Sequence, residues 1–211
     1  KTTIPEEEFD AHLLLNATLA YYFVHQNDDV FTALDLLVAV ESKIDTTSQI
    51  VNNLTHFQLH KAYALVERSR QHHLQEFDHK IRMLSYSTQA SADDASSTSI
   101  ATFTAQEQVQ IATEISVSAL LSDAIYNLGD ILTHSIIQKH TPSAIKSLLQ
   151  VFQDGNLAAF QEFKLGQIAE LAPHQAFLLR KLQVIALINY VFAKPATQRT
   201  FAFNDVSVVV H

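Results

Sequence analysis

Apolar side chains recur at three- and four-residue spacing along most of the chain, which is the spacing of helices that pack against other helices. In the segment 105–134, the residues Val109, Ala112, Ile115 and Ala119 fall near one helical face. Little interrupts this periodicity, because the 211 residues include only three Gly and four Pro. An all-β fold needs many tight turns, and so few turn-forming residues cannot supply them. The sequence therefore predicts an all-α protein.

A pair of helices is predicted within the segment 105–134. Thr104 followed by Glu107 matches a capping box, so we expect a helix to begin at residue 105. A second, short helix is expected over residues 123–128, with Gly129 as its left-handed C-cap. These patterns predict packed helices and indicate no chemistry.

The N-terminal 87 residues are predicted to form helical repeats. Helices are expected over residues 5–25, 30–44, 48–70 and 72–86, joined in pairs by short polar turns. The repeat length of about 35–42 residues lies in the range of tetratricopeptide-like solenoids, in which neighbouring pairs bury each other's apolar faces. Residues 88–103 are Ser-rich and are interpreted as a flexible surface loop, in preference to a phosphorylation site.

The C-terminal half is predicted to be helical until shortly before its end. Helices are expected over 143–152, 157–171 and 175–193, and the last is apolar almost all round, so we expect it to be a buried spine. Residues 199–203 alternate as in a short strand, and Asn204-Asp205 is expected to cap a helix that contains Val206, Val208 and Val209.

The ends of the chain and its apolar runs suggest a soluble fragment. The acidic N-terminus has no apolar run of a signal peptide, and the longest uncharged apolar-rich run, 182–193, is shorter than the ~20 residues that cross a bilayer. The chain begins at Lys1 and its one Met is Met83. We therefore expect a soluble piece of a longer protein, with no membrane partner.

Charge and motifs argue against several classes of function. The net charge of −8, with Lys and Arg scattered, gives no basic face for nucleic acid. Cysteine is absent, so thiol chemistry is not available. The sequence contains no nucleophile elbow, no P-loop and no dinucleotide-binding glycine motif. We predict no catalytic residue and no cofactor.

Eleven histidines raise the alternative of a metal-dependent helical hydrolase. His56 and His60 have the spacing of two zinc ligands on one helix, but a zincin needs Glu after the first His and the chain has Phe57 there. His72 and His79 are the second candidate pair. Surface or groove histidines are the preferred interpretation, so we predict no metal site.

Two phrases in the segment 105–134 resemble a known family closely. Residues 115–123 read ISVSALLSD and residues 125–132 read IYNLGDIL. They are similar to the PCI-domain subunits of the proteasome regulatory-particle lid called non-ATPase regulatory subunit thirteen. That family carries the phrase S-x-S-A-L-L-x-D-x-I-Y-N-x-G-x-L-L-x-H, and Ile131 replaces the first of its paired leucines.

Further matches extend this resemblance over about residues 105–205, whereas over 1–87 only the order of helices agrees. The matching positions are Asp154, Gly155 and Phe160, and then His174, Phe177, Leu178 and Lys181 in an H-x-x-F-L-x-x-K phrase. A PCI domain is a helical-repeat array that runs into a winged helix. The resemblance thus implies N-terminal repeats over 1–87, the helical part of a PCI domain over 104–198, and the truncated start of a winged helix over 199–211.

The resemblance also implies a function. It predicts a non-catalytic scaffold of the proteasome lid, cytoplasmic and nuclear, which supports lid assembly and ubiquitin-dependent protein degradation. Its partners would be other lid subunits of PCI and MPN type and neighbouring regulatory-particle subunits. Phe201 and Phe203 are the candidate partner interface, since a winged helix would place them near a neighbouring subunit. The alternatives are a PCI subunit of the COP9 signalosome or of translation initiation factor three, and a free-standing helical-repeat peptide binder.

Overall fold

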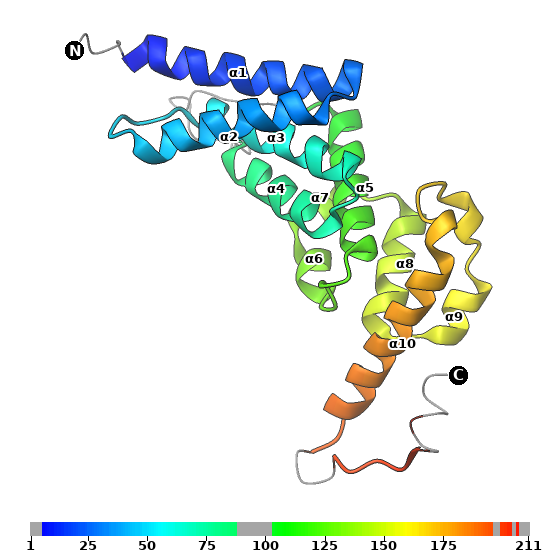
Figure 1. Cartoon of the computed structure of the whole chain (residues 1–211). Helices are drawn as coiled ribbons and strands as arrows, with labels where there is room; N and C mark the ends of the chain where they lie inside the picture. The colour runs from blue at the N-terminus through cyan, green and yellow to red at the C-terminus, as the bar shows by residue number, and fades with distance from the viewer. Residues whose placement is uncertain (1–5, 88–102, 196–198, 204–205, 207–211) are drawn as a thin grey trace. The chain divides into compact units, whose positions relative to one another are not determined.

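Four helices build the N-terminal unit of the computed structural model, which describes residues 6–87, 103–195, 199–203 and 206. The chain divides into two units, Lys1–Thr104 and Ala105–His211. In the first, α1 (Glu6–Asn27) packs on α2 (Val30–Thr46) and α3 (Asn53–Ser69), and α3 packs on α4 (His73–Tyr86) (Figure 1). The prediction of paired helices in an all-α fold is confirmed, and the described residues contain no strand.

The turn between α1 and α2 sets the geometry of this unit. Asp28 adopts a left-handed conformation with φ of 51°, which short polar residues tolerate, and so reverses the chain. The Asp29 carboxylate then accepts a hydrogen bond from the Thr32 amide at 3.1 Å and caps α2. Small residues at the contact, Ala20 on α1 and Ala33 on α2, are fully buried, which lets the two helices approach closely. The core is completed by Leu13, Ala17, Val24, Leu37, Val40, Leu59, Ala62, Tyr63 and Val66.

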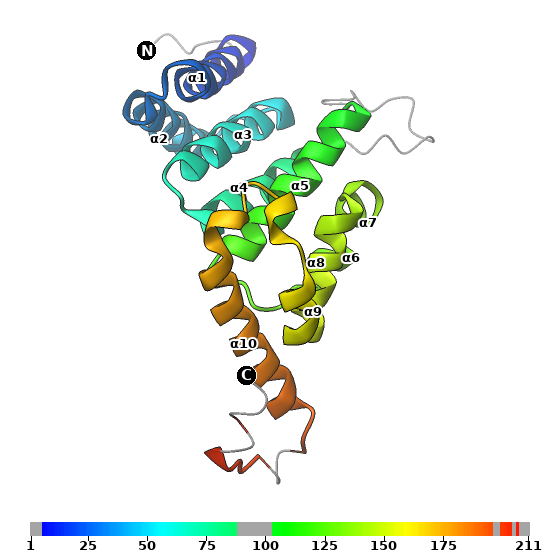
Figure 2. The same cartoon turned by 90° about the vertical axis from the view of Figure 1, so that its right-hand side faces the viewer.

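The second unit contains six helices among the residues that the structure describes. They are α5 (Ala105–Leu121), α6 (Gly129–Thr133), α7 (Ser135–His140), α8 (Ser143–Asp154), α9 (Leu157–Glu162) and α10 (Gln175–Phe192). α5 packs on α7, α8 and α10, and α10 also packs on α8 and α9. Figure 2 shows the second half of α10 extending beyond α8 and α9. The largest fully buried side chains here include Ile115, Leu120, Leu148, Phe152, Leu178 and Leu182.

Two predicted helices in this unit are wrong in detail. Residues 123–128 are not helical, and Gly129 begins α6 where a C-cap was expected. The Asn127 side chain explains the difference, because its Oδ1 accepts from the Gly129 amide at 3.1 Å and its Nδ2 donates to Asp130.

The predicted helix 157–171 ends at Glu162 and continues as short 3-10 turns, Leu165–Gln167 and Ala172–His174. Leu165 and Leu171 are both buried. One straight helix would point residues six positions apart to different faces, so the chain has to unwind to bury both.

The end of the described chain also differs from expectation. Residues 199–203 form no strand; the backbone is helical at Phe203 and Val206, and the Val206 amide donates to the Ala202 carbonyl at 3.3 Å. The helix expected after Asn204-Asp205 thus has helical backbone at Val206, whereas Val208 and Val209 lie outside the described residues, as do residues 88–102 of the expected Ser-rich loop. The winged helix over 199–211 stays a prediction.

α10 is buried on one side only. The expectation that this helix is a buried spine is therefore correct for that side and wrong for the other. Leu178, Leu182 and Ile185 are buried, but Val184, Ile188 and Phe192 are exposed. By length and composition the segment Ala172–Phe192 could cross a membrane, which is weak support for a span because core helices of soluble proteins pass the same test.

Candidate partner-binding surface

The four histidines of the two alternative metal pairs have other partners in the structure. His60 lies beside His79, with their Nδ1 atoms 3.1 Å apart, whereas His56 stacks on Tyr86 and His72 pairs with Glu67 at 2.7 Å. Among the described residues there is no group of three or more His, Asp or Glu side chains that could hold a metal ion. Three histidines of α3 and α4 belong to a row of contacting rings, in which every contact is stacked except the tilted one between His60 and His79; the row is His56, Tyr86, His60, His79 and Tyr63.

The His60–His79 pair predicts acid sensitivity. Burial, helped by the charges of His79, Arg82 and His56, lowers the pKa of His60 from 6.5 to about 4. Between about pH 6.5 and about pH 4, His60 is therefore protonated in the unfolded chain and neutral in the folded chain. The free energy of unfolding falls as the pH falls through this range. We expect the free energy of unfolding to drop by about 2 kcal/mol between about pH 7.5 and about pH 5 through this group alone.

Urea denaturation followed by circular dichroism at several pH values measures this effect. The variant His60→Phe keeps a ring to stack on Tyr86 and should lose that part of the pH dependence, whereas the exposed His12→Gln should retain it. An unchanged pH slope in His60→Phe would show that the buried pair does not control acid stability.

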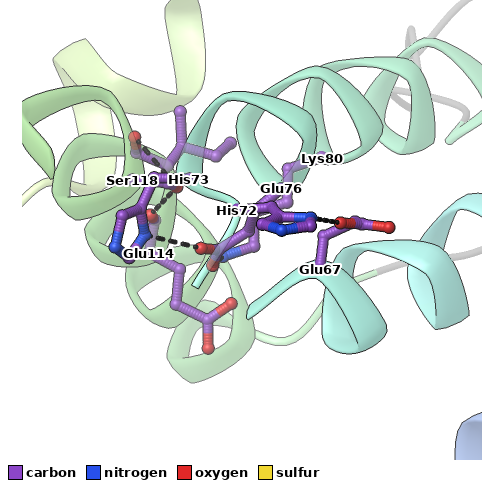
Figure 3. Close-up of polar contacts among 8 residues, drawn as sticks. Glu67, His72, His73, Glu76, Lys80, Glu114 and Ser118 are labelled. Carbon is purple, nitrogen blue, oxygen red and sulfur yellow. Dashed lines mark hydrogen bonds and ion pairs between the residues drawn. The ribbon is translucent and has the colours of Figure 1, made fainter. Parts of the chain in front are cut away.

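Charged side chains are buried on α4, which the sequence did not lead us to expect. Glu76 is 3% exposed and accepts a hydrogen bond from Lys80, 4% exposed, at 2.5 Å. At the end of α3, Glu67 pairs with His72 (Figure 3). It also pairs with Arg70 at 3.0 Å. The i, i+4 spacing of Glu76 and Lys80 was the available signal, but that spacing is common on exposed helix faces and does not reveal burial. In each pair the charge of a buried carboxylate lies beside a Lys, Arg or His side chain.

Of the two predicted interface residues, Phe201 belongs to an aromatic cluster at the end of α10. Phe201 is half-buried against Tyr190, with ring centres 5.2 Å apart. The Lys194 ammonium lies 4.8 Å from the Tyr190 ring centre and 5.2 Å from that of Phe201. Two cation–π contacts therefore hold the segment after α10 against its last turn.

The remaining aromatic rings of this region are exposed. Phe192 is 67% exposed, with the Arg199 guanidinium 5.0 Å from its ring centre, and Phe203 is 95% exposed. Val184 and Ile188 continue the apolar surface along α10 at four-residue spacing. We call Val184, Ile188, Phe192, Phe201 and Phe203, with Lys194 and Arg199, the α10 surface. Exposed apolar and aromatic side chains with Arg beside them are typical of protein–protein contacts.

A buried lysine fixes α10 in place. Lys181 is 3% exposed, and its Nζ donates to the carbonyls of Ala119 at 2.8 Å, Leu120 at 3.0 Å and Ser122 at 2.5 Å. Burial lowers the pKa of Lys181 to about 8, opposed by the nearby charge of Asp123. The ammonium thus satisfies carbonyls at the C-terminus of α5, where the helix dipole favours a cation. Lys181 positions the helix that carries the α10 surface.

This contact joins two of the phrases by which the sequence resembles a known family. Ala119 and Leu120 belong to the phrase at residues 115–123, and Lys181 ends the H-x-x-F-L-x-x-K phrase, about sixty residues later along the chain. The resemblance identified Lys181 only as a residue that matches the family motif. Its role was not visible, because no local pattern shows that a lysine meets backbone carbonyls so far away in sequence.

The chain matches the family model described as PSD13 N-terminal repeats over residues 1–152. It is 29% identical over 210 residues to the 26S proteasome regulatory subunit RPN9 of Saccharomyces cerevisiae, which covers 96% of this chain and 50% of that protein. It is 30% identical over 119 residues to 26S proteasome non-ATPase regulatory subunit 13 homolog B of Arabidopsis thaliana, covering 52% and 31%. The probable 26S proteasome regulatory subunit rpn9 of Schizosaccharomyces pombe is 29% identical over 181 residues, covering 83% and 44%. The chain spans at most half the length of these relatives.

Proposed function

The chain belongs to the family of proteasome lid subunits that includes non-ATPase regulatory subunit 13 and RPN9, and we propose that it acts there as a non-catalytic scaffold. The observation that carries the proposal is the family match over residues 1–152, on a chain whose described part is an array of packed helices. In this role it supports lid assembly, and through it ubiquitin-dependent protein degradation, by contacts with other subunits. The complex works in the cytoplasm and the nucleus.

The α10 surface is the part of the chain that we assign to subunit contact. It combines exposed rings at Phe192 and Phe203 with the cations Lys194 and Arg199, and aromatic and Arg side chains carry much of the binding energy in protein interfaces. The partners are lid subunits of PCI and MPN type and other neighbours in the regulatory particle. Residues 199–211 would begin the winged helix of the PCI domain, which brings this surface to the edge where such domains meet.

The other candidate functions have less support. The relatives described above are named as proteasome subunits, which favours the proteasome over the COP9 signalosome and initiation factor three. A hydrolase built on His56/His60 or His72/His79 would need a ligand set, and among the described residues no three His, Asp or Glu side chains are grouped to hold a metal ion.

An affinity purification tests both the role and the surface. We expect the full-length protein, tagged in its own cells, to recover the other lid subunits, as identified by mass spectrometry. Phe203→Ser removes a 95% exposed ring and should lower that recovery at least fivefold, since a hot-spot aromatic contributes about 2 kcal/mol or more.

The matched control for this experiment is Ile50→Ser, which removes an 87% exposed apolar side chain from the N-terminal unit and should leave recovery unchanged. Equal recovery with Phe203→Ser would refute the assignment of the surface. Recovery of no lid subunit by the wild-type protein would refute the scaffold role itself.

A further inference from the structure

α1 is apolar on two opposite faces, and only one of them is covered. Leu13, Ala17, Ala20 and Val24 form the inner face and are at most 5% exposed. On the opposite face Leu15 is 61%, Leu19 43% and Tyr22 50% exposed, at spacings of four and three residues. At 1.5 Å per residue, this outer stripe is about 10 Å long from Leu15 to Tyr22.

α2 repeats this arrangement within the same hairpin. Its inner face is Ala33, Leu37 and Val40, which are fully buried, whereas Phe31 is 86% and Val38 54% exposed on the opposite side. α1 and α2 pack against each other, and we call the exposed stripes of the two helices together, Leu15, Leu19 and Tyr22 with Phe31 and Val38, the outer hairpin face. The Tyr22 ring is held by an edge-to-face contact with Tyr21, at 5.8 Å between ring centres, and the Lys61 ammonium lies 4.8 Å from the Tyr21 ring centre.

The exposed apolar side chains of α1 and α2 recur at helical spacing and are not scattered singly over the two helices. Exposed apolar residues that gather on one surface, in place of being scattered, mark a binding site. The outer hairpin face therefore requires a partner that supplies apolar side chains.

The charge around this face indicates the chemistry of the partner. From Glu6 to Ser42 the sequence has neither Lys nor Arg, and it has eight acidic residues: Glu6, Glu7, Glu8, Asp10, Asp28, Asp29, Asp35 and Glu41. Glu8 is exposed and lies seven residues before Leu15, on the same side of α1, while Asp35 is exposed between Phe31 and Val38. A second copy of the chain would bring the same acids to the contact and be repelled. A basic partner would be attracted.

We propose that the outer hairpin face binds a basic amphipathic helix of a partner protein. The apolar side of that helix covers Leu15, Leu19 and Tyr22, and its Lys and Arg side chains lie toward Glu8 and Asp35. Amphipathic helices are recognised through apolar anchors at i, i+3, i+4 and i+7. The proposal does not depend on the scaffold role in the lid or on the α10 surface.

A pair of synthetic helices tests the proposal on the 211-residue chain. One fluorescent peptide has Leu and Ile on one face and Lys on the other, and the second has the same apolar face with Glu in place of Lys. Fluorescence anisotropy should show that the Lys peptide binds at least tenfold more tightly than the Glu peptide, and that its affinity falls as salt is raised. The double variant Leu15→Gln/Leu19→Gln keeps helix propensity and should bind the Lys peptide about tenfold more weakly.

Two further variants complete the design. Val109→Gln, which replaces a 40% exposed side chain on α5, should bind the Lys peptide as the wild type does. Glu8→Lys/Asp35→Lys should reverse the preference and favour the Glu peptide. Equal binding of both peptides, or undiminished binding to Leu15→Gln/Leu19→Gln with an unchanged circular dichroism spectrum, would overturn the proposal. So would salt-independent dimerisation of the chain through this face, measured by sedimentation.

Discussion

The variant Gly155→Ala is expected to lower the free energy of unfolding by about 2–5 kcal/mol, through two separate effects. Gly155 ends α8 with φ of 68°, a left-handed conformation in which a Cβ costs about 1–2 kcal/mol. A Cβ at this position would also lie 2.9 Å from the Ala186 Cα and 3.2 Å from its amide nitrogen, on the backbone of α10. Because a helix backbone cannot move aside as a flexible side chain does, the overpacking adds about 1–3 kcal/mol.

The clash would also disturb the contact between α8 and α10. The Asn189 side-chain nitrogen lies 3.2 Å from the added Cβ and donates to the Gln153 carbonyl at 3.0 Å. Urea denaturation followed by helical circular dichroism measures the loss. Gly166→Ala is the matched control, since no atom lies within 4 Å of its Cβ position, and it should be neutral or slightly stabilising. If both variants unfolded at the same urea concentration, the close approach of α8 and α10 would be disproved.

The second large effect is expected at Lys181. In Lys181→Met the three carbonyls of Ala119, Leu120 and Ser122 lose their donor, and each buried carbonyl left unsatisfied costs about 1–3 kcal/mol. Removing the buried charge of Lys181 offsets part of this loss of stability. A pKa lowered from 10.5 to about 8 corresponds to about 3 kcal/mol of unfavourable burial. The net loss is therefore expected to be about 2–4 kcal/mol, because the unsatisfied carbonyls outweigh the relieved charge.

The neighbouring residue on α10 supplies the control for this variant. Arg180 is exposed, so Arg180→Met makes the same change in net charge and should alter the free energy of unfolding by no more than about 0.5 kcal/mol. Thermal or urea denaturation of the two variants side by side separates burial from charge. A Lys181→Met chain as stable as Arg180→Met would mean that water replaces the ammonium at the end of α5.

The helices could be predicted where local periodicity decides the structure. Three of the four helices of the N-terminal unit begin and end within two residues of their expected positions, and the turn at residues 27–29 was visible because its polar residues cap and reverse the chain. The third begins at Asn53 and not at residue 48, because the Asn52 side chain accepts from the Leu54 amide and caps α3 there. The start of α6 was missed, because the Asn127 side chain bonds the Gly129 amide and the sequence alone offered Gly129 as a stop. Single side chains that compete with the helix decide such boundaries.

Tertiary contacts explain the remaining differences. Leu165 and Leu171 are both buried only because the chain unwinds between them, and periodicity cannot show which residues the neighbouring helices will cover. On α1 the sequence contains two apolar stripes, through Leu13 and through Leu15, and it does not reveal which of them is exposed. Of the candidate interface, the exposure of Phe203 was an open question, and the cations Lys194 and Arg199 beside the aromatic rings were not expected.

The contact of Lys181 with α5 has a consequence for how such a protein can vary. Its partners are main-chain carbonyls, which every amino acid at positions 119, 120 and 122 supplies equally. No substitution on α5 can compensate for a change at Lys181, so the two sites are not expected to vary as a pair among relatives. Methods that infer spatial neighbours from correlated substitutions would therefore overlook this contact, although it holds together segments about sixty residues apart.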